Sequence, residues 1–176
     1  METNKVKQIH SFGQSIWLDF IDRAIIGNGK LKALIDDDGI RGVTSNPAIF
    51  EKAISSSDLY DADIAALSDG KKTTEEVFFD LAIKDIQNAC DLFKGLYNES
   101  NKGDGYVSLE VSPFLALKGE ETFEQAKLLW KQVKKKIKEN LTKISKRKDF
   151  LVLRCIILEV SSAVRNVSSE ITVWQS

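Results

Sequence analysis

Three short alternating segments each carry a polar side chain that could act on a hydroxylated substrate. Asp19 closes the first segment, Asn46 follows the second, and Glu110 lies late in the third. A carboxylate can accept or return a proton, and an amide can orient a hydroxyl group by hydrogen bonding. If the segments end at one edge, these groups predict proton transfer on a substrate rich in hydroxyls. The same pattern also fits carboxylates that only face solvent, and spacing alone does not identify a reaction.

Other kinds of catalytic site have few residues available. His10 is the only histidine, and Cys90 and Cys155 lie far apart in apolar stretches without a Cys-x-x-Cys motif. A histidine-based triad and a multi-histidine zinc site are therefore nearly excluded, and we expect no metal site. Both cysteines are expected to be small buried apolar residues.

Composition places the chain among ordinary globular proteins. It has 176 residues, a net charge of -1, 43% hydrophobic residues and 29% charged residues, which fits one domain with a core. No apolar run approaches the roughly 18 residues that a membrane span needs, and the N-terminus lacks an apolar signal core. We therefore expect a cytoplasmic protein with no membrane contact.

The elements that must position these groups alternate between strands and helices. Strands are predicted at residues 15–20, 42–45 and 105–112 from their alternation and flanking turn residues. Strands separated by helices cannot pair as hairpins, so the order predicts parallel βα units. The predicted helices run from residue 28 or 29 to 35 with a stop at Gly39, over 48–54, 58–67 and 74–98 with a capping box at Thr73 and Glu76, and onward from a cap at Thr122 and Gln125.

Alternation along these strands separates two faces in a parallel α/β barrel. One face would pack on the helices, with Ile16, Leu18, Val43, Ser45, Val107, Leu109 and Val111. The other would point inward, with Trp17, Asp19, Thr44, Asn46, Ser108 and Glu110. Barrel enzymes place their active sites at the C-terminal ends of the strands, where Asp19, Asn46 and Glu110 would lie.

Several of these segments resemble one protein family. Residues 39–54, Gly-Ile-Arg-Gly-Val-Thr-Ser-Asn-Pro-Ala-Ile-Phe-Glu-Lys-Ala-Ile, closely resemble the second-strand motif of transaldolases. Residues 15–19 resemble the first strand of that family, residues 105–113 its third strand, and Leu129-Trp130 the helix that follows. The helical insert between the second and third strands is similar to that of a subfamily found in many bacteria and cyanobacteria. The resemblance covers about residues 11–133.

The resemblance implies a parallel (β/α)8 barrel, here incomplete, with about three N-terminal βα units plus extra helices. It implies transfer of a dihydroxyacetone unit between sugar phosphates, from sedoheptulose 7-phosphate and glyceraldehyde 3-phosphate to erythrose 4-phosphate and fructose 6-phosphate. No metal or organic cofactor would be needed, because a lysine Schiff base acts as the electron sink. Asp19 would handle the hydroxyl proton, Glu110 would act as general acid and base through a water, and Thr44 and Asn46 would bind the dihydroxyacetone unit.

The chain departs from the family pattern at the Schiff-base lysine. The family carries this lysine on its fourth strand in a motif similar to Met-Ile-Lys-Ile-Pro-Ala-Thr, and the chain contains no Lys-Ile-Pro. The nearest string is Asn140-Leu-Thr-Lys143-Ile144-Ser145, which aligns only with a one-residue gap. Lys143 is thus a candidate Schiff-base lysine, and a solvated surface lysine is the alternative.

The last part of the chain has a different composition. Residues 120–176 contain no glycine and no proline, so we expect no further βα units there. We divide the chain into a transaldolase-like part, 1–133, and a basic and apolar tail, 134–176. A frameshift near the three lysines at 134–136 and a divergent short product are two explanations, and either leaves a truncated chain that we expect to be inactive.

The basic segment 131–148 allows a different interpretation. It holds nine lysines and arginines and one acid, so it could contact nucleic acid or an anionic surface. Aromatic residues do not alternate with these lysines, which disfavours single-strand binding. We therefore expect sugar phosphates as partners and no nucleic acid, with a non-enzymatic interaction module as the alternative. The oligomeric state does not follow from the sequence.

Overall fold

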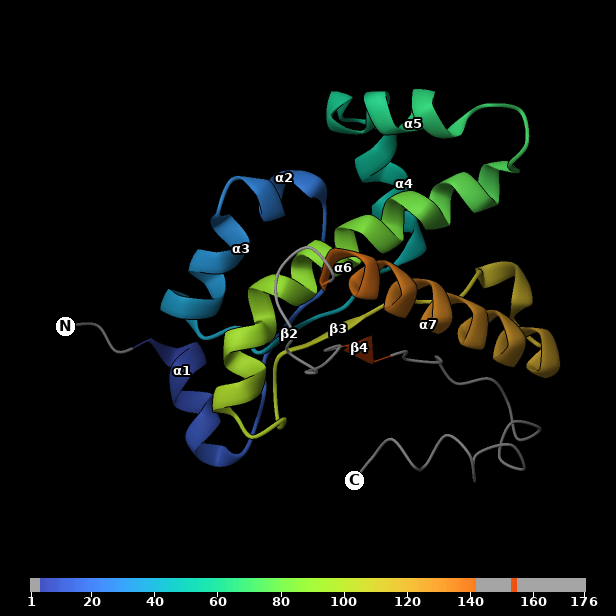
Figure 1. The fold of residues 1–176 in the computed structure, drawn as a ribbon. Helices are drawn as coiled ribbons and strands as arrows, with labels where there is room; N and C mark the ends of the chain where they lie inside the picture. The colour runs from blue at the N-terminus through green and yellow to red at the C-terminus, as the bar shows by residue number, and fades with distance from the viewer. Residues whose placement is uncertain (1–3, 142–152, 155–176) are drawn as a thin grey trace.

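Four short parallel strands form the centre of the described structure. The computed structural model describes residues 4–141 and 153–154. Within these residues the strands are β1 (Trp17–Leu18), β2 (Gly42–Val43), β3 (Tyr106–Ser108) and β4 (Leu153–Arg154). They lie in the order β1-β2-β3-β4, and every neighbouring pair is parallel. The prediction of a parallel sheet with helices between its strands is confirmed (Figure 1).

The sheet has one strand more than the sequence predicted. In β4, Leu153 pairs with Val107 and Arg154 pairs with Ser108, although no glycine or proline follows Gly119. No further βα units were expected in this part of the chain and no strand was predicted at residues 153–154, so β4 was missed. An edge strand such as β3 exposes a row of unpaired backbone donors and acceptors. Another segment of the chain can pair with them even where no glycine or proline marks a turn before it.

Helices surround this sheet and are short except for two. The described helical elements are α1 (Lys5–Ile9), η1 (His10–Phe12), α2 (Arg23–Gly27), α3 (Lys30–Ala33), the π-turn η2 (Leu34–Asp38), α4 (Pro47–Ser55), η3 (Asp58–Tyr60), α5 (Asp61–Leu67), α6 (Thr74–Glu99), η4 (Pro113–Leu115) and α7 (Gly119–Leu141). The predicted helix after residue 28 is thus α3 with its π-turn. Four helical elements were not predicted, namely α1, α2, η1 and η4.

The longest helix, α6, packs against one face of the sheet. Val43, Val107 and Leu109 lie in the same buried cluster as the inner face of α6, and Ile16, Leu18 and Val111 pack against that cluster. This confirms the predicted outward face for these apolar residues. The apolar stripe of the helix is buried and includes Leu81, Ala82, Ile86, Ala89, Phe93 and Leu96.

Helix ends follow the predicted capping residues in most places. At the start of α6 the Thr73 backbone N–H donates to Glu76 Oε2 at 2.7 Å, and the Glu76 N–H donates to Thr73 Oγ1 at 3.2 Å, which is the predicted capping box. Gly39 ends the π-turn with a φ of 82°, a left-handed conformation that favours glycine. Pro47 is the first residue of α4, where its missing N–H costs nothing.

The predicted cap of the last helix was wrong. Helix α7 begins at Gly119, and the Thr122 hydroxyl donates to the carbonyls of Leu115 and Lys118 at 3.0 and 2.8 Å. Gln125 Oε1 instead accepts from the Ser112 N–H at 2.6 Å. Both side chains therefore tie the helix to the turn after β3, which a capping motif read along the sequence does not reveal.

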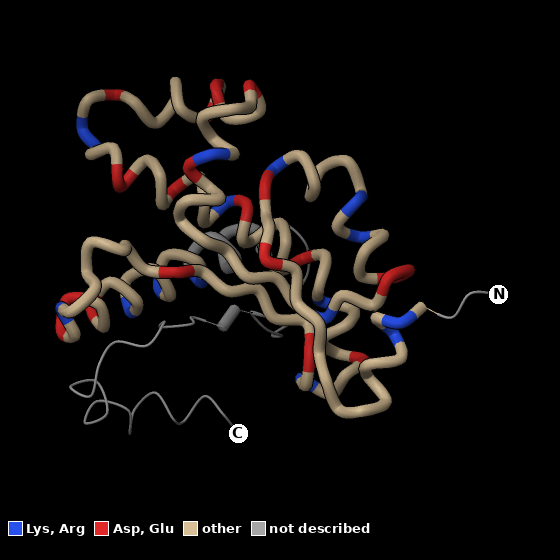
Figure 2. The backbone as a smooth tube through the Cα atoms, turned by 180° about the vertical axis from the view of Figure 1, so that it is seen from behind, with Lys and Arg blue, Asp and Glu red and all other residues tan. Residues whose placement is uncertain are grey.

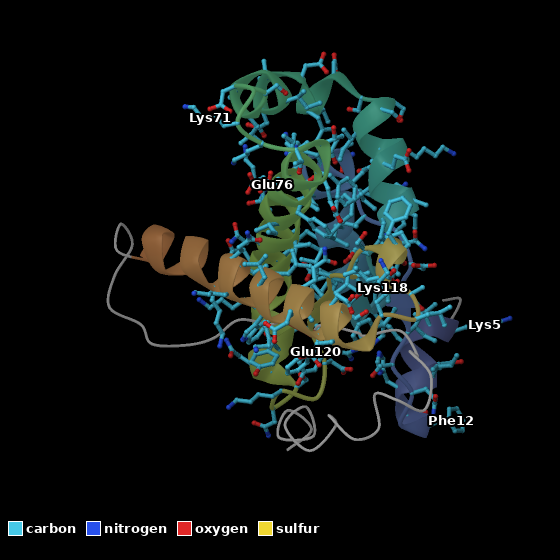
Figure 3. All side chains as sticks on the ribbon, turned by 90° about the vertical axis from the view of Figure 1, so that its right-hand side faces the viewer. Lys5, Phe12, Lys71, Glu76, Lys118 and Glu120 are labelled. Carbon is cyan, nitrogen blue, oxygen red and sulfur yellow. The ribbon has the colours of Figure 1, made fainter. Side chains whose placement is uncertain are left out.

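The two ends of the strands face different parts of the molecule. Helix α1 lies at the N-terminal ends, where Lys7 Nζ donates to the Asp36 carbonyl at 2.9 Å. The C-terminal ends lead into α2 and α4, and α4 continues to the insert of η3 and α5 that meets α6 (Figure 1). Figure 3 shows Phe12, beside α1, and Lys71, between α5 and α6, at opposite ends of the molecule. The C-terminal ends of the strands and the helical insert thus share one end.

Candidate functional site at the C-terminal ends of the strands

Asp19 and Thr44 are in contact just beyond the ends of β1 and β2. The Thr44 hydroxyl donates to Asp19 Oδ1 at 2.6 Å, and the Thr44 N–H donates to the Leu18 carbonyl at 2.9 Å. The register that pairs Leu18 with Val43 therefore continues one residue further. Asp19 is exposed, so its second carboxylate oxygen is available to a molecule arriving from solvent.

Glu110 is close enough to Asp19 for the two carboxyl groups to interact electrostatically. Partial burial raises the pKa of Glu110, and the negative charge of Asp19 raises it further. A carboxyl group with a raised pKa holds its proton at higher pH and can return it to a substrate, as general acid catalysis requires. At this edge of the sheet, Thr44 therefore bonds to Asp19, and Glu110 lies within electrostatic range of Asp19.

Of the other two predicted site residues, the structure describes only Asn46. Asn46 is partly buried, and its Oδ1 accepts the Ala48 N–H at 2.8 Å, so its carbonyl oxygen caps α4. This leaves its amide group as the donor for a ligand. Lys143, the candidate Schiff-base lysine, lies outside the described residues.

A buried serine pair lies directly beneath these groups. The Ser45 hydroxyl donates to the Ser108 carbonyl at 2.6 Å, and Ser108 Oγ accepts the Ser45 N–H at 3.2 Å. Both side chains are almost fully buried. The pair thus joins β2 to β3 where their regular ladder ends, one residue after Thr44.

Two aromatic rings lie on the same face of the sheet, two residues earlier along the strands. Trp17, Gly42 and Tyr106 lie side by side in the register, and the rings of Trp17 and Tyr106 stack with centroids 6.5 Å apart at 12°. A Cβ at Gly42 would come within 2.5 Å of Trp17 Cδ2. The indole of Trp17 therefore lies across Gly42, and the stacked pair of Trp17 and Tyr106 lies next to the polar groups along the strands.

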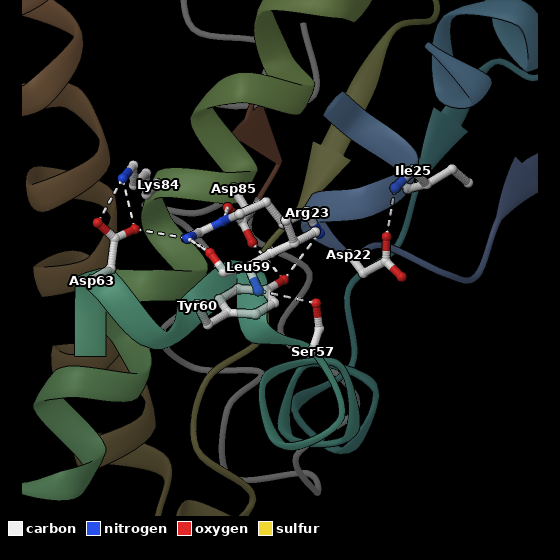
Figure 4. A network of polar contacts seen from close by, with 9 residues as sticks. All are labelled: Asp22, Arg23, Ile25, Ser57, Leu59, Tyr60, Asp63, Lys84 and Asp85. Atoms are coloured by element: carbon white, nitrogen blue, oxygen red, sulfur yellow. Dashed lines mark hydrogen bonds and ion pairs between the residues drawn. The ribbon is translucent and has the colours of Figure 1, made fainter. Parts of the chain in front are cut away.

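A second polar cluster joins α2, the insert and α6 (Figure 4). Arg23 Nε donates to Asp85 Oδ1 at 3.0 Å, and the Tyr60 hydroxyl donates to Asp85 Oδ2 at 2.8 Å. The Arg23 guanidinium also lies 4.2 Å from the centre of the Tyr60 ring. On the outer side, Asp63 Oδ2 accepts from Arg23 Nη1 and from Lys84 Nζ, both at 2.7 Å.

Burial decides the charge balance of this cluster. It raises the pKa of Asp85, which is fully buried, and the hydrogen bonds from Tyr60 and Arg23 do not fully offset this. Burial lowers the pKa of Arg23, but the charges and hydrogen bonds of Asp85 and Asp63 outweigh it, so the pKa of Arg23 is raised. The hydrogen bond from Lys84 lowers the pKa of Asp63.

Sequence reasoning missed this cluster although a signal was present. Asp85 stands on the apolar stripe of α6, between Ala82 and Ile86. A carboxylate on a buried face needs partners, so its position predicts a polar cluster. The partners Arg23 and Tyr60 come from elements far away in the chain, and nothing in the sequence identifies them.

Comparison with known proteins connects these residues to one family. A family model described as Transaldolase/Fructose-6-phosphate aldolase matches residues 16–148, which is most of the chain. The chain belongs to the transaldolase family. All of the predicted site residues, Asp19, Thr44, Asn46, Glu110 and Lys143, lie within the matched range.

Named transaldolases show the same relationship. The chain is 48% identical over 126 residues to "Transaldolase" of Trichodesmium erythraeum, 44% over 133 residues to "Transaldolase 2" of Nostoc punctiforme, and 42% over 130 residues to "Transaldolase" of Thiobacillus denitrificans. These alignments cover 72%, 76% and 74% of the chain, but 33%, 35% and 36% of the relatives. The chain therefore matches about a third of the length of these curated transaldolases.

The transaldolase family implies a TIM barrel, and the parallel sheet with its helices is consistent with part of one.

Figure 2 shows acidic and basic positions interspersed along the described backbone. The first part of the basic segment, up to Leu141, continues α7. No helix in the described ranges is long and apolar enough to cross a membrane.

Proposed function

We propose that this chain supplies the proton-transfer and hydroxyl-binding groups of a transaldolase. The reaction would move a dihydroxyacetone unit from sedoheptulose 7-phosphate to glyceraldehyde 3-phosphate, giving erythrose 4-phosphate and fructose 6-phosphate. The observation that carries this proposal is the hydrogen bond from Thr44 to Asp19 at the strand ends, within electrostatic range of Glu110, in a chain of the transaldolase family.

Each of these residues has a chemical task in the proposal. The free oxygen of Asp19 would accept a sugar hydroxyl proton, because Thr44 holds the other oxygen at 2.6 Å and fixes the carboxylate plane. Glu110 would deliver and recover a proton through a water, which its raised pKa favours. The Asn46 amide group would donate a hydrogen bond to the dihydroxyacetone unit.

The covalent step requires an amine that attacks the ketone of the sugar. The amine nitrogen bonds to the carbonyl carbon, water leaves, and the protonated imine then accepts electrons when the neighbouring carbon–carbon bond breaks. The chain has no Lys-Ile-Pro motif, and Lys143 is its candidate amine. We propose that the isolated chain binds the sugar unit but does not turn it over.

Carboxyl footprinting tests the binding part of this proposal. Carbodiimide labelling of carboxyl groups, followed by peptide mass spectrometry, reports access to each one. We expect dihydroxyacetone at high concentration to slow labelling of Asp19 and Glu110, while Glu99, an exposed residue at the end of α6, keeps its rate. Asp19→Asn should abolish the protection of Glu110. Equal labelling with and without the ketone at every concentration would refute the proposed site.

Borohydride trapping tests the covalent part. The chain is incubated with fructose 6-phosphate, reduced with borohydride and digested for mass spectrometry, with Lys143→Arg as the matched control. We expect no sugar adduct in the isolated chain. An adduct on Lys143 that disappears in the control would identify the Schiff-base lysine and overturn the proposed inactivity.

A further inference from the structure

A loop of four residues connects the end of β1 to the start of α2, and Asp19 is its first residue. The loop runs from Asp19 to Asp22, between Leu18 and Arg23. Its beginning is fixed because the Thr44 N–H bonds to the Leu18 carbonyl at 2.9 Å. A connection this short has little freedom when both of its ends are fixed, so the place of α2 decides where Asp19 can go.

Helix α2 cannot hold that place alone. It has five residues and only one of them, Ile25, is buried. Isolated helices of this length are unstable in water, and tertiary contacts must hold them. Asp22 caps the helix by accepting the Ile25 N–H at 2.6 Å, but this bond is internal to the segment and does not tie it to the rest of the molecule.

Ile21 and Ile25 pack into the core, and two buried polar side chains from outside the segment hold the first residue of the helix. Tyr60 accepts the Arg23 backbone N–H at 2.9 Å on its hydroxyl oxygen, and the same hydroxyl donates to Asp85 at 2.8 Å. Asp85 also accepts from the Arg23 side chain at 3.0 Å. Tyr60 and Asp85 are 1% and 0% exposed, so water cannot replace these bonds without the cluster opening.

We propose that Tyr60 and Asp85 are positioning residues for Asp19: by holding the first residue of α2 through its backbone and its side chain, they fix the loop that presents the Asp19 carboxylate beside Thr44 and Glu110. This gives the helical insert between β2 and β3 a task at the sugar site, because Tyr60 ends η3 and Asp85 lies on α6. The sugar role of Asp19 rests on the proposed function, whereas the mechanical link does not.

The test compares two variants that each remove one polar group of the cluster. Tyr60→Phe deletes the hydroxyl that joins the Arg23 N–H to Asp85. Lys84→Met is the control, because Lys84 pairs with Asp63 on the outer side of the same cluster and does not touch α2. Hydrogen exchange is followed by mass spectrometry on peptides covering the loop and α2, and carbodiimide labelling against pH reports the pKa of Glu110.

In Tyr60→Phe we expect exchange in residues 20–26 to become about tenfold faster, because the two buried hydrogen bonds of the hydroxyl, from the Arg23 N–H and to Asp85, are lost. The pKa of Glu110 should fall toward its ordinary value, because the charge of Asp19 no longer stands at a fixed place beside it. Lys84→Met should change neither quantity. A merely structural role of Tyr60 would alter exchange and stability without moving the pKa of Glu110.

Several outcomes would overturn the proposal. They are an unchanged pKa of Glu110 in Tyr60→Phe, or the same change in both variants. If Tyr60→Phe does not fold, Asp85→Asn replaces it, since the amide keeps one acceptor oxygen for Arg23 Nε and removes the acceptor of the Tyr60 hydroxyl. We then expect about threefold faster exchange in the loop, and no change would refute the link. Neither readout contains a sugar, so failure of sugar binding would refute the proposed function alone.

Discussion

The buried carboxylate of Asp85 offers the sharpest test of how the insert is held. Replacing it by alanine removes the acceptor of two donors, Arg23 Nε at 3.0 Å and the Tyr60 hydroxyl at 2.8 Å. Both donors lie on the inner side of the cluster, and the Tyr60 side chain is 1% exposed. A buried donor without an acceptor costs about 1–3 kcal/mol.

Two effects limit the size of the loss. Arg23 keeps the Leu59 carbonyl at 2.8 Å and Asp63 at 2.7 Å as acceptors for Nη1, so its charge stays compensated. The raised pKa of Asp85 also shows that burying its charge carries a cost, which the variant avoids. We therefore expect Asp85→Ala to lower the free energy of unfolding by about 3 kcal/mol, at the low end of the range for breaking a buried ion pair.

Pulse proteolysis in a urea series at low protein concentration measures this change. Asp63→Ala is the matched control: Asp63 carries ion pairs to Arg23 and Lys84 but is 29% exposed, so its removal should cost at most about 1 kcal/mol. The reasoning is refuted if the two variants lose the same free energy, or if Asp85→Ala loses less than about 1 kcal/mol.

Three further predictions concern the packing of Trp17 on Gly42, a strained turn and the carboxyl group of Glu110. Gly42→Ala should lower the free energy of unfolding by about 1–3 kcal/mol in the same assay, because its methyl group meets the Trp17 ring at 2.5 Å, and an unchanged midpoint would exclude this close packing. Leu117→Gly should raise the stability by about 0.5–1 kcal/mol, because Leu117 has a φ of 72° and is 87% exposed, so glycine relieves strain without losing burial. Glu110→Gln should gain stability relative to the natural chain as the pH rises. The raised pKa of Glu110 means that the folded state holds this proton more tightly than the unfolded state. The natural chain therefore loses stability from about pH 4, where the unfolded group ionises, up to the folded pKa, and the variant does not. Urea midpoints at about pH 4 and about pH 7 measure the difference, and a gap that does not widen with pH would contradict the raised pKa.

Much of the fold followed from periodicity and turn residues. The parallel arrangement was predictable because helices separate the first three strands, and the start of α6 because Thr73 and Glu76 make a capping box. The strands themselves are two or three residues long, shorter than the alternating segments. Alternation continues where the chain is extended, whereas a ladder forms only where a neighbouring strand lies close.

The parts that sequence reasoning missed all depend on contacts between distant segments. Tyr60 and Arg23 are 37 positions apart, and their bond connects the backbone of one to the side chain of the other. Strand β4 forms because β3 offers an edge, and Gln125 bonds to Ser112 where a helix cap was predicted. Such pairings depend on tertiary geometry, which no local pattern encodes.

The candidate site divides in the same way. Strand alternation predicted that Asp19, Thr44 and Glu110 share a face, and the structure brings them together. It did not predict that Thr44 would bond to Asp19, nor that the oxygen of Asn46 would cap α4. The roles of all of these residues and of Lys143 stay predictions.

The most direct test of the account is the pKa of Glu110, measured by carboxyl labelling against pH in the natural chain and in Asp19→Asn. This substitution keeps an oxygen that can accept the Thr44 hydroxyl and removes the negative charge. We predict a pKa above the ordinary value of about 4.3 in the natural chain, and a lower one in Asp19→Asn that burial still keeps raised. A pKa at or below the ordinary value, or one that ignores the charge of Asp19, would contradict a shared site at the strand ends.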